Sequence, residues 1–134
     1  MKEIKIGEEI YAIHASMSDL KEGSEWFGER HESLQASRMK YAAGKTFKVH
    51  RHILNPRTIK ITQESFVVIS GRMAIDIYDI KGNLLGTLEV GPGEAVFIYR
   101  GGHGVRVLED LVAYEVKAGS FSYVSEDKEF QDGL

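Results

Sequence analysis

Two histidines alternate along GKTFKVHRH, a run of the sequence that reads as a β-strand. Because successive side chains of a strand point to opposite faces, His50 and His52 project side by side, with Lys48 on the same face. Phe47 and Val49 lie on the other face. Imidazoles at this spacing can bind one ion, and imidazole is the commonest nitrogen ligand for zinc, iron, copper and nickel. The residues alone leave open a plain pair of solvent-facing histidines.

Composition narrows the possible functions. The chain has 134 residues, no cysteine and a formal net charge of -3. No thiolate ligand, disulfide or cysteine nucleophile is possible, so a metal ion must be held by nitrogen and oxygen. This net charge does not favour binding to nucleic acid. No apolar run approaches the roughly 20 residues of a membrane-spanning helix. Because the start, MKEIKIGEEI, lacks a secretory signal, we expect a cytoplasmic protein without nucleic-acid or membrane partners.

The elements that must position these residues are strands. From about residue 40 the sequence consists of short alternating runs separated by glycine, without long stripes of helical period. The expected strands are Ser33–Tyr41, Lys45–His52, Ser65–Ser70, Arg72–Tyr78, Leu84–Val90, Ala95–Tyr99, Gly104–Leu108 and Leu111–Lys117. Short glycine-containing loops between them predict antiparallel hairpins.

This pattern predicts an all-β fold. The polar stretch Ser18–Glu32 is the only plausible helix, and Gly23 and Gly28 weaken it. So many short strands must bury one face, which favours a double-sheet jelly roll or a small closed barrel. We expect a single domain over residues 1–134, with an N-terminal extension before a core barrel at about 33–118 and a solvated tail from 126.

Three sequence segments resemble the motifs of the cupin superfamily. Gly44 is separated by five residues from His50-Arg51-His52, as at the opening of the first cupin motif. The segment ESFVVISG is similar to its close, with Glu64 followed after six residues by Gly71. GEAVFIYRGGHG is similar to the second motif, with His103 where the family has its third histidine. The resemblance implies a double-stranded β-helix, the small single-domain jelly roll of this superfamily.

The resemblance also implies one divalent metal ion (zinc, iron, manganese or nickel) bound by His50, His52, Glu64 and His103. Eleven residues separate His52 from Glu64, more than is usual for the family, so we expect a longer loop there. Gln63 could offer an oxygen instead of Glu64. The carboxylate is favoured because it neutralises part of the charge of the ion.

Polar residues around the open metal position are candidates for substrate contact. Lys48, Gln63, Arg57 and Arg106 are expected to bind substrate, and the basic side chains would suit an anionic ligand. Tyr99 and Glu115 are the candidate proton carriers. Tyr99 stands where the family usually has proline.

The resemblance implies a metal-dependent isomerase or epimerase that acts on a small sugar or sugar-derived metabolite. The alternative is a non-catalytic protein, a binding or sensing module without turnover, because fold does not dictate function. A metal-dependent dioxygenase is a third possibility. We also expect a homodimer, since the strand-like start Ile4–Ala15 could pair with a partner at a sheet edge.

Overall fold

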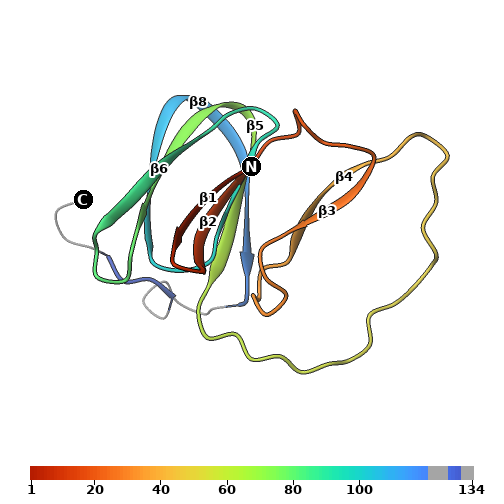
Figure 1. Ribbon diagram of the computed structural model, residues 1–134, viewed down its shortest axis with the longest axis horizontal. Coiled ribbons are helices and arrows are strands. Elements are labelled where there is room, and N and C mark those ends of the chain that lie inside the picture. The colour runs from red at the N-terminus through yellow and green to blue at the C-terminus, as the bar shows by residue number, and fades with distance from the viewer. Residues whose placement is uncertain (121–126, 131–134) are drawn as a thin grey trace.

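The structure, a computed structural model, describes residues 1–120 and 127–130, and all its elements are strands (Figure 1). The strands are β1 (Lys2–Ile6), β2 (Glu9–Ala15), β3 (Gly23–Phe27), β4 (Ala36–Lys40), β5 (Gln63–Tyr78), β6 (Leu84–Val90), β7 (Ala95–Ile98) and β8 (Gly102–Ala118). The all-β prediction is confirmed. Most of the expected tail, 126–134, lies outside the described residues. No helix in the part of the chain that the structure describes is long and apolar enough to cross a membrane.

Six strands form one sheet that curls into a half-barrel (Figure 1). Its order is β1-β2-β7-β5-β6, and β8 pairs with β5. β5 is antiparallel to all its neighbours: β7 pairs with its first part, β6 with its second part, and β8 runs along nearly its whole length. β5 and β8 are therefore the frame on which the sheet is built.

β5 bends sharply at Gly71. This residue has a φ of 82°, and the register with β8 shifts on both sides of it. The sequence predicted two strands here, but bulges let one strand bend without ending, and β8 likewise runs unbroken where two strands were expected. The bend turns the second half of β5 back over the first.

The main core fills the inside of the curl. The side chains of Met73, Ile75 and Ile77 alternate along β5 and are completely buried, together with Val90 of β6 and Val96 of β7. Each such side chain contributes about 1.5 to 3 kcal/mol relative to an exposed one.

A second, smaller core lies on the outer face of the sheet under the β3–β4 hairpin. Phe27 of β3 stacks on Phe97 of β7 with ring centroids 4.9 Å apart, and Tyr99 packs beside them. The prediction of a helix over Ser18–Glu32 is wrong. Gly23, the first residue of β3, and Gly28, which follows β3, have φ values of 119° and 70°, which a helix interior does not allow.

The segment 41–62 forms an arm that projects from the body beside the β3–β4 hairpin and returns to the start of β5 (Figure 1). The expected strand Lys45–His52 is not formed. A strand needs a neighbour to share its backbone hydrogen bonds, and none of the described strands pairs with this segment.

Replacement of Gly71 by alanine tests the bend. A Cβ there would lie 1.9 Å from the Asp110 carbonyl oxygen, so that the backbone must shift in addition to adopting a left-handed conformation. We expect Gly71→Ala to lower the free energy of unfolding by at least about 2 kcal/mol in urea denaturation. Gly93→Ala is the matched control, because its φ is 76° but nothing lies within 4 Å of its Cβ, and it should cost only about 1 kcal/mol. Equal losses would contradict this account of the bend.

Candidate functional site

The curl of the sheet brings together two of the predicted metal ligands. Glu64, the second residue of β5, lies opposite Ile98, a residue of the main core, while His103 of β8 lies opposite the buried Ile77. Residues directly opposite in an antiparallel ladder share a face, so both side chains point to the inside of the curl. His103 Nε2 lies 2.5 Å from Glu64 Oε1. The pair joins the start of β5 to the start of β8 across the half-barrel.

The electrostatics of Glu64 favour the carboxylate. Its side chain is only 6% exposed, and burial alone would raise its pKa. The hydrogen bond and charge of His103, the charge of Lys117 and a hydrogen bond with Glu115 outweigh burial, so that the pKa of Glu64 is lowered from its ordinary value. An ionised carboxylate therefore faces the interior at neutral pH.

Lys117 is the central cation of this region. Its Nζ lies 3.9 Å from Glu64 Oε2, 3.7 Å from Glu115 Oε1 and 3.8 Å from Asp127 Oδ2. The Thr62 hydroxyl donates a hydrogen bond to Asp127. Because Glu115 and Lys117 are two residues apart on β8, they share the inner face with Glu64. Lys117 was not among the residues predicted from the sequence, although its spacing from Glu115 is that of two side chains on one strand face.

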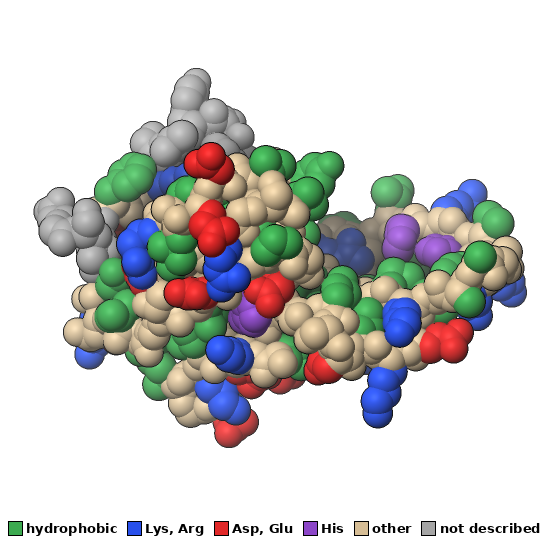
Figure 2. Space-filling model, turned by 90° about the horizontal axis from the view of Figure 1, so that it is seen from above, with side chains coloured by type: hydrophobic (Ala, Val, Ile, Leu, Met, Phe, Trp, Pro, Cys, Tyr) green, Lys and Arg blue, Asp and Glu red, His purple; other side chains and the backbone are tan. Residues whose placement is uncertain are grey.

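The other two predicted ligands lie on the arm. His50 and His52 are exposed, with ring centroids 5.4 Å apart. Figure 2 shows histidine side chains on the part of the molecule that projects from the body. Within residues 1–120 and 127–130 of a single chain, no group of three or more histidine, aspartate or glutamate side chains is placed to hold an ion. The structure thus gives two pairs of candidate ligands, separated from each other.

The geometry of each pair is close to that needed to bind a metal ion. Ligand atoms about 2.1 Å from one ion and at right angles to each other lie about 3.0 Å apart, so the Glu64 and His103 atoms would need to separate by roughly half an ångström. Two imidazoles on one tetrahedral ion have centroids about 5 Å apart, close to the spacing of the arm histidines. His50 Nδ1 lies 3.0 Å from the Lys48 carbonyl oxygen. If Nδ1–H donates to that oxygen, Nε2 keeps its lone pair for an ion.

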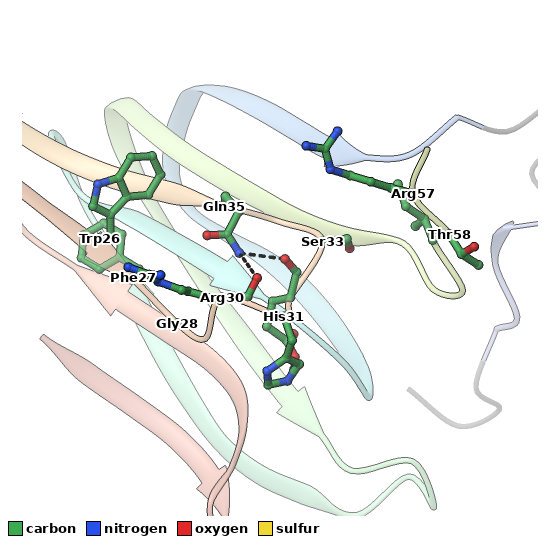
Figure 3. Close-up of a pocket in the computed structure, with 11 residues that line it drawn as sticks. Trp26, Phe27, Gly28, Arg30, His31, Ser33, Gln35, Arg57 and Thr58 are labelled. Carbon is green, nitrogen blue, oxygen red and sulfur yellow. Dashed lines mark hydrogen bonds and ion pairs between the residues drawn. The ribbon is translucent and has the colours of Figure 1, made fainter. Parts of the chain in front are cut away.

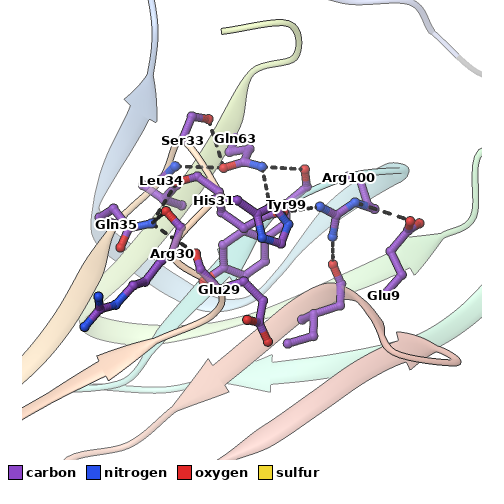
Figure 4. A network of polar contacts seen from close by, with 12 residues as sticks. Glu9, Glu29, Arg30, His31, Ser33, Leu34, Gln35, Gln63, Tyr99 and Arg100 are labelled. Carbon is purple, nitrogen blue, oxygen red and sulfur yellow. Dashed lines mark hydrogen bonds and ion pairs between the residues drawn. The ribbon is translucent and has the colours of Figure 1, made fainter. Parts of the chain in front are cut away.

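Gln63 has a different role from its neighbour. Its amide oxygen accepts hydrogen bonds from the Leu34 backbone N–H at 2.7 Å and the Ser33 hydroxyl at 3.0 Å. Its amide nitrogen donates to Glu32 at 2.6 Å and to the Tyr99 carbonyl oxygen at 3.2 Å (Figure 4). These partners lie on the outer side of the sheet. The structure therefore leaves Glu64, and not Gln63, as the oxygen donor that faces the interior.

Tyr99 also belongs to the outer side. Its ring is 1% exposed and packs in the second core, on the face of the sheet opposite that of Ile98 and Glu64. Burial and the nearby charge of Glu32 raise the pKa of Tyr99 to about 12, and its hydroxyl has no hydrogen-bond partner among the described residues. This placement separates Tyr99 from the inner pair of candidate ligands.

The candidate substrate-binding residues are dispersed. Arg106 forms a two-point ion pair with Asp76, with N–O distances of 2.9 Å, on the outer face of β8 and β5. Lys48 is exposed on the arm. Arg57, also on the arm, lines a hollow of ≈ 780 Å³ whose opposite side is formed by β3 and the residues that follow it, Trp26 and His31 among them (Figure 3).

An ionic network around the buried carboxylate of Glu32, near Gln63, was not predicted from the sequence. Arg100 donates hydrogen bonds to the carboxylate of Glu32 and to the Ile10 carbonyl oxygen (Figure 4). The carboxylate of Glu32 is almost completely buried, and its Oε1 also lies 3.1 Å from His31 Nε2. The network ties the loop before β4 to β2 and β7. No spacing in the sequence indicates it, because its members come from separate segments.

Comparisons with protein-family models, with curated proteins and with solved structures give no match for this chain.

Substitutions of the neighbours Gln63 and Glu64 separate structural from chemical roles. Gln63→Leu leaves buried donors and acceptors without partners, so we expect the free energy of unfolding to fall by about 2 kcal/mol or more in urea denaturation. Gln35→Leu is the control, since its amide also donates to backbone carbonyls but is exposed to water, and it should cost less than about 1 kcal/mol. A smaller loss for Gln63→Leu than for Gln35→Leu would refute the structural role.

Glu64 gives the folded state a pH dependence of defined sign. Its pKa is lower in the folded chain than in the unfolded chain, so the unfolded state binds more protons at acidic pH. The stabilisation is fully present above the unfolded pKa of about 4.3 and is lost as the pH falls through the lower folded pKa. In Glu64→Gln this contribution is absent. With a chelator present, its free energy of unfolding should therefore change less steeply than that of the wild type below about pH 5. Parallel profiles would contradict the assignment.

Proposed function

We propose that the chain is a small cupin-type, metal-dependent enzyme whose centre lies inside the curled sheet. Glu64 and His103 form the fixed half of that centre, and His50 and His52 supply the other half. Three imidazoles and one carboxylate leave at least one coordination position open, which is typical of catalytic rather than structural sites. The expected ion is zinc, iron, manganese or nickel.

The contact between Glu64 and His103 carries this proposal. A buried carboxylate and an imidazole from distant parts of the sequence point at one place on the inner face, with Nε2 and Oε1 2.5 Å apart. His103 is partly exposed, so the place can be reached from solvent. The resemblance to the cupin motifs had assigned these same two residues to one ion.

The surrounding residues suit a reaction that moves a proton within a sugar-like substrate. When bound, a divalent ion would polarise the oxygens of a carbonyl or enediolate. Glu115 shares the inner face and is about half exposed, so that it can take or return a proton. Lys117, within ion-pair distance of Glu64 and Glu115, can stabilise negative charge on a substrate oxygen. We therefore favour an isomerase or epimerase of a sugar or sugar-derived metabolite.

A binding module without turnover is the second candidate. The ion pair between Glu115 and Lys117 favours it, because a carboxylate that contacts a cation is held away from a substrate proton. The two candidates differ in one readout. In D₂O, an isomerase or epimerase exchanges the hydrogen beside the substrate carbonyl, and proton NMR of candidate sugars and sugar phosphates detects that exchange. Binding without exchange supports the second candidate.

Metal retention tests the centre directly. Zn²⁺, Mn²⁺, Fe²⁺ and Ni²⁺ are offered separately, excess metal is removed by gel filtration, and bound metal is measured by elemental analysis. We expect about one ion per chain in the wild type and at least a tenfold loss of affinity in His103→Ala and in His50→Ala/His52→Ala. His14→Ala is the matched control, because His14 also contacts a carboxylate, that of Glu94, at 3.3 Å, and it should retain the metal. Equal metal content in all variants would overturn the proposal.

A further inference from the structure

One edge of β8 pairs with none of the strands in the part of the chain that the structure describes. Within the described residues this 17-residue strand pairs only with β5, so its other edge presents unpaired backbone groups. Val107 on its inner face is 60% exposed, and Tyr114 on its outer face is 67% exposed. Edge strands of such length and apolarity are ordinarily covered or blunted, because they pair readily with other chains.

The arm, in turn, is a strand-like segment without a strand partner among the described residues. Its segment 45–54 has the alternation of a strand, yet none of the described strands pairs with it. Val49 is 97% exposed, and Phe47, Ile53 and Leu54 are also largely in solvent. Within the described residues there is thus a strand-like segment that pairs with no strand, and a strand edge that no strand covers.

The two faces of the arm match the two faces of β8. Lys48, His50 and His52 share one face of an extended arm, and Phe47 and Val49 share the other. If the histidine face joins the inner face of β8, it adds two imidazoles to the side that holds Glu64 and His103. The apolar face then meets the outer row formed by Val112, Tyr114 and Val116, all more than half exposed. A slip of one residue would reverse both faces, so only registers that keep the histidines on the inner side can form the centre.

The arm is held away from its own β8. Tyr41, at its root, is within hydrogen-bond distance of Ser24 of β3, with the two hydroxyl oxygens 2.8 Å apart. Phe47 packs edge-on against the Tyr41 ring, with centroids 5.0 Å apart. These contacts direct the arm along the β3–β4 hairpin, away from the sheet (Figure 1). An arm anchored in this direction can reach a second molecule, and symmetric exchange then covers two edges at once.

We infer that two copies of the chain exchange their arms, each adding segment 45–54 as a strand to the free edge of the partner's β8. Each metal centre then takes His50 and His52 from one copy and Glu64 and His103 from the other. The part of this inference that concerns the centre rests on the function proposed above. The strand exchange rests only on the arm, its anchor and the uncovered edge.

Complementation between two defective variants tests the shared centre. The arm variant is His50→Ala/His52→Ala, and the barrel variant is Glu64→Gln. Copies with different affinity tags are co-expressed, the mixed dimer is isolated through both tags, and retained Zn²⁺ and Ni²⁺ are measured. Exchange gives one intact centre per mixed dimer, half the wild-type content, whereas neither variant alone retains metal. If each arm folds back onto its own chain, the mixed dimer retains no metal and the inference is overturned.

A second measurement does not depend on metal. In the presence of a chelator, light scattering should give a mass of about twice the 15.0 kDa of one chain. Val49→Asp places a charge on the buried face of the exchanged strand and should weaken the dimer at least tenfold. Ile80→Asp is the control, since Ile80 is similarly exposed but lies in the turn between β5 and β6, and it should leave the dimer intact.

The two measurements separate the two proposals. A dimer that Val49→Asp dissociates but that binds no metal supports strand exchange and overturns the metal centre. A monomer that binds metal supports the centre and overturns the exchange. A dimer that Val49→Asp and Ile80→Asp leave equally intact also overturns the exchange.

Discussion

The antiparallel ladder between β5 and β8 is the constraint on which the rest of the structure depends. It joins the two longest strands of the chain, and the register shifts around Gly71 bend both strands together. Every other strand of the main sheet is connected to this ladder through β7 or β6. Because the bend folds the ladder back on itself, apolar side chains that alternate along one strand can enclose a core with those of its neighbours.

The same bend explains why Glu64 and His103 meet. Glu64 lies at one end of the ladder and His103 at the other, so in a flat sheet they would be separated by most of the length of β5. Burial disfavours an isolated carboxylate, and the cationic groups that converge on it offset that cost. The functional proposal therefore depends on the curvature of the sheet, and that curvature depends on a few backbone torsions.

Much of the fold follows from local patterns, and the remainder does not. The strand Leu84–Val90 was predicted with the observed bounds, because alternation and a flanking glycine turn define it locally. The bend in β5 was read as a turn, since a glycine in a strand can serve either purpose. The bend in β8 falls at Glu109 and Asp110, which separated the two strands expected there. The family resemblance placed Glu64 and His103 at one site. The hydrogen bonds of Gln63 depend instead on the loop at Ser33 and Leu34, far away in the sequence, and no residue spacing indicates that contact. The strand expected at Lys45–His52 depends on a neighbour, and sequence alone cannot say where that neighbour lies.

Gln63 and Glu64 are consecutive residues with opposite directions, one locked into a hydrogen-bonded loop and the other aimed at the interior. By holding Gln63, the loop before β4 fixes the position and orientation of the Glu64 carboxylate. Because the arm precedes Gln63 and is exposed, its length can change without moving Gln63 or Glu64. Insertion of one residue between positions 63 and 64 would put the two side chains on the same face. Evolution of this chain can therefore vary the length of the arm far more freely than the residue at which the arm rejoins the sheet.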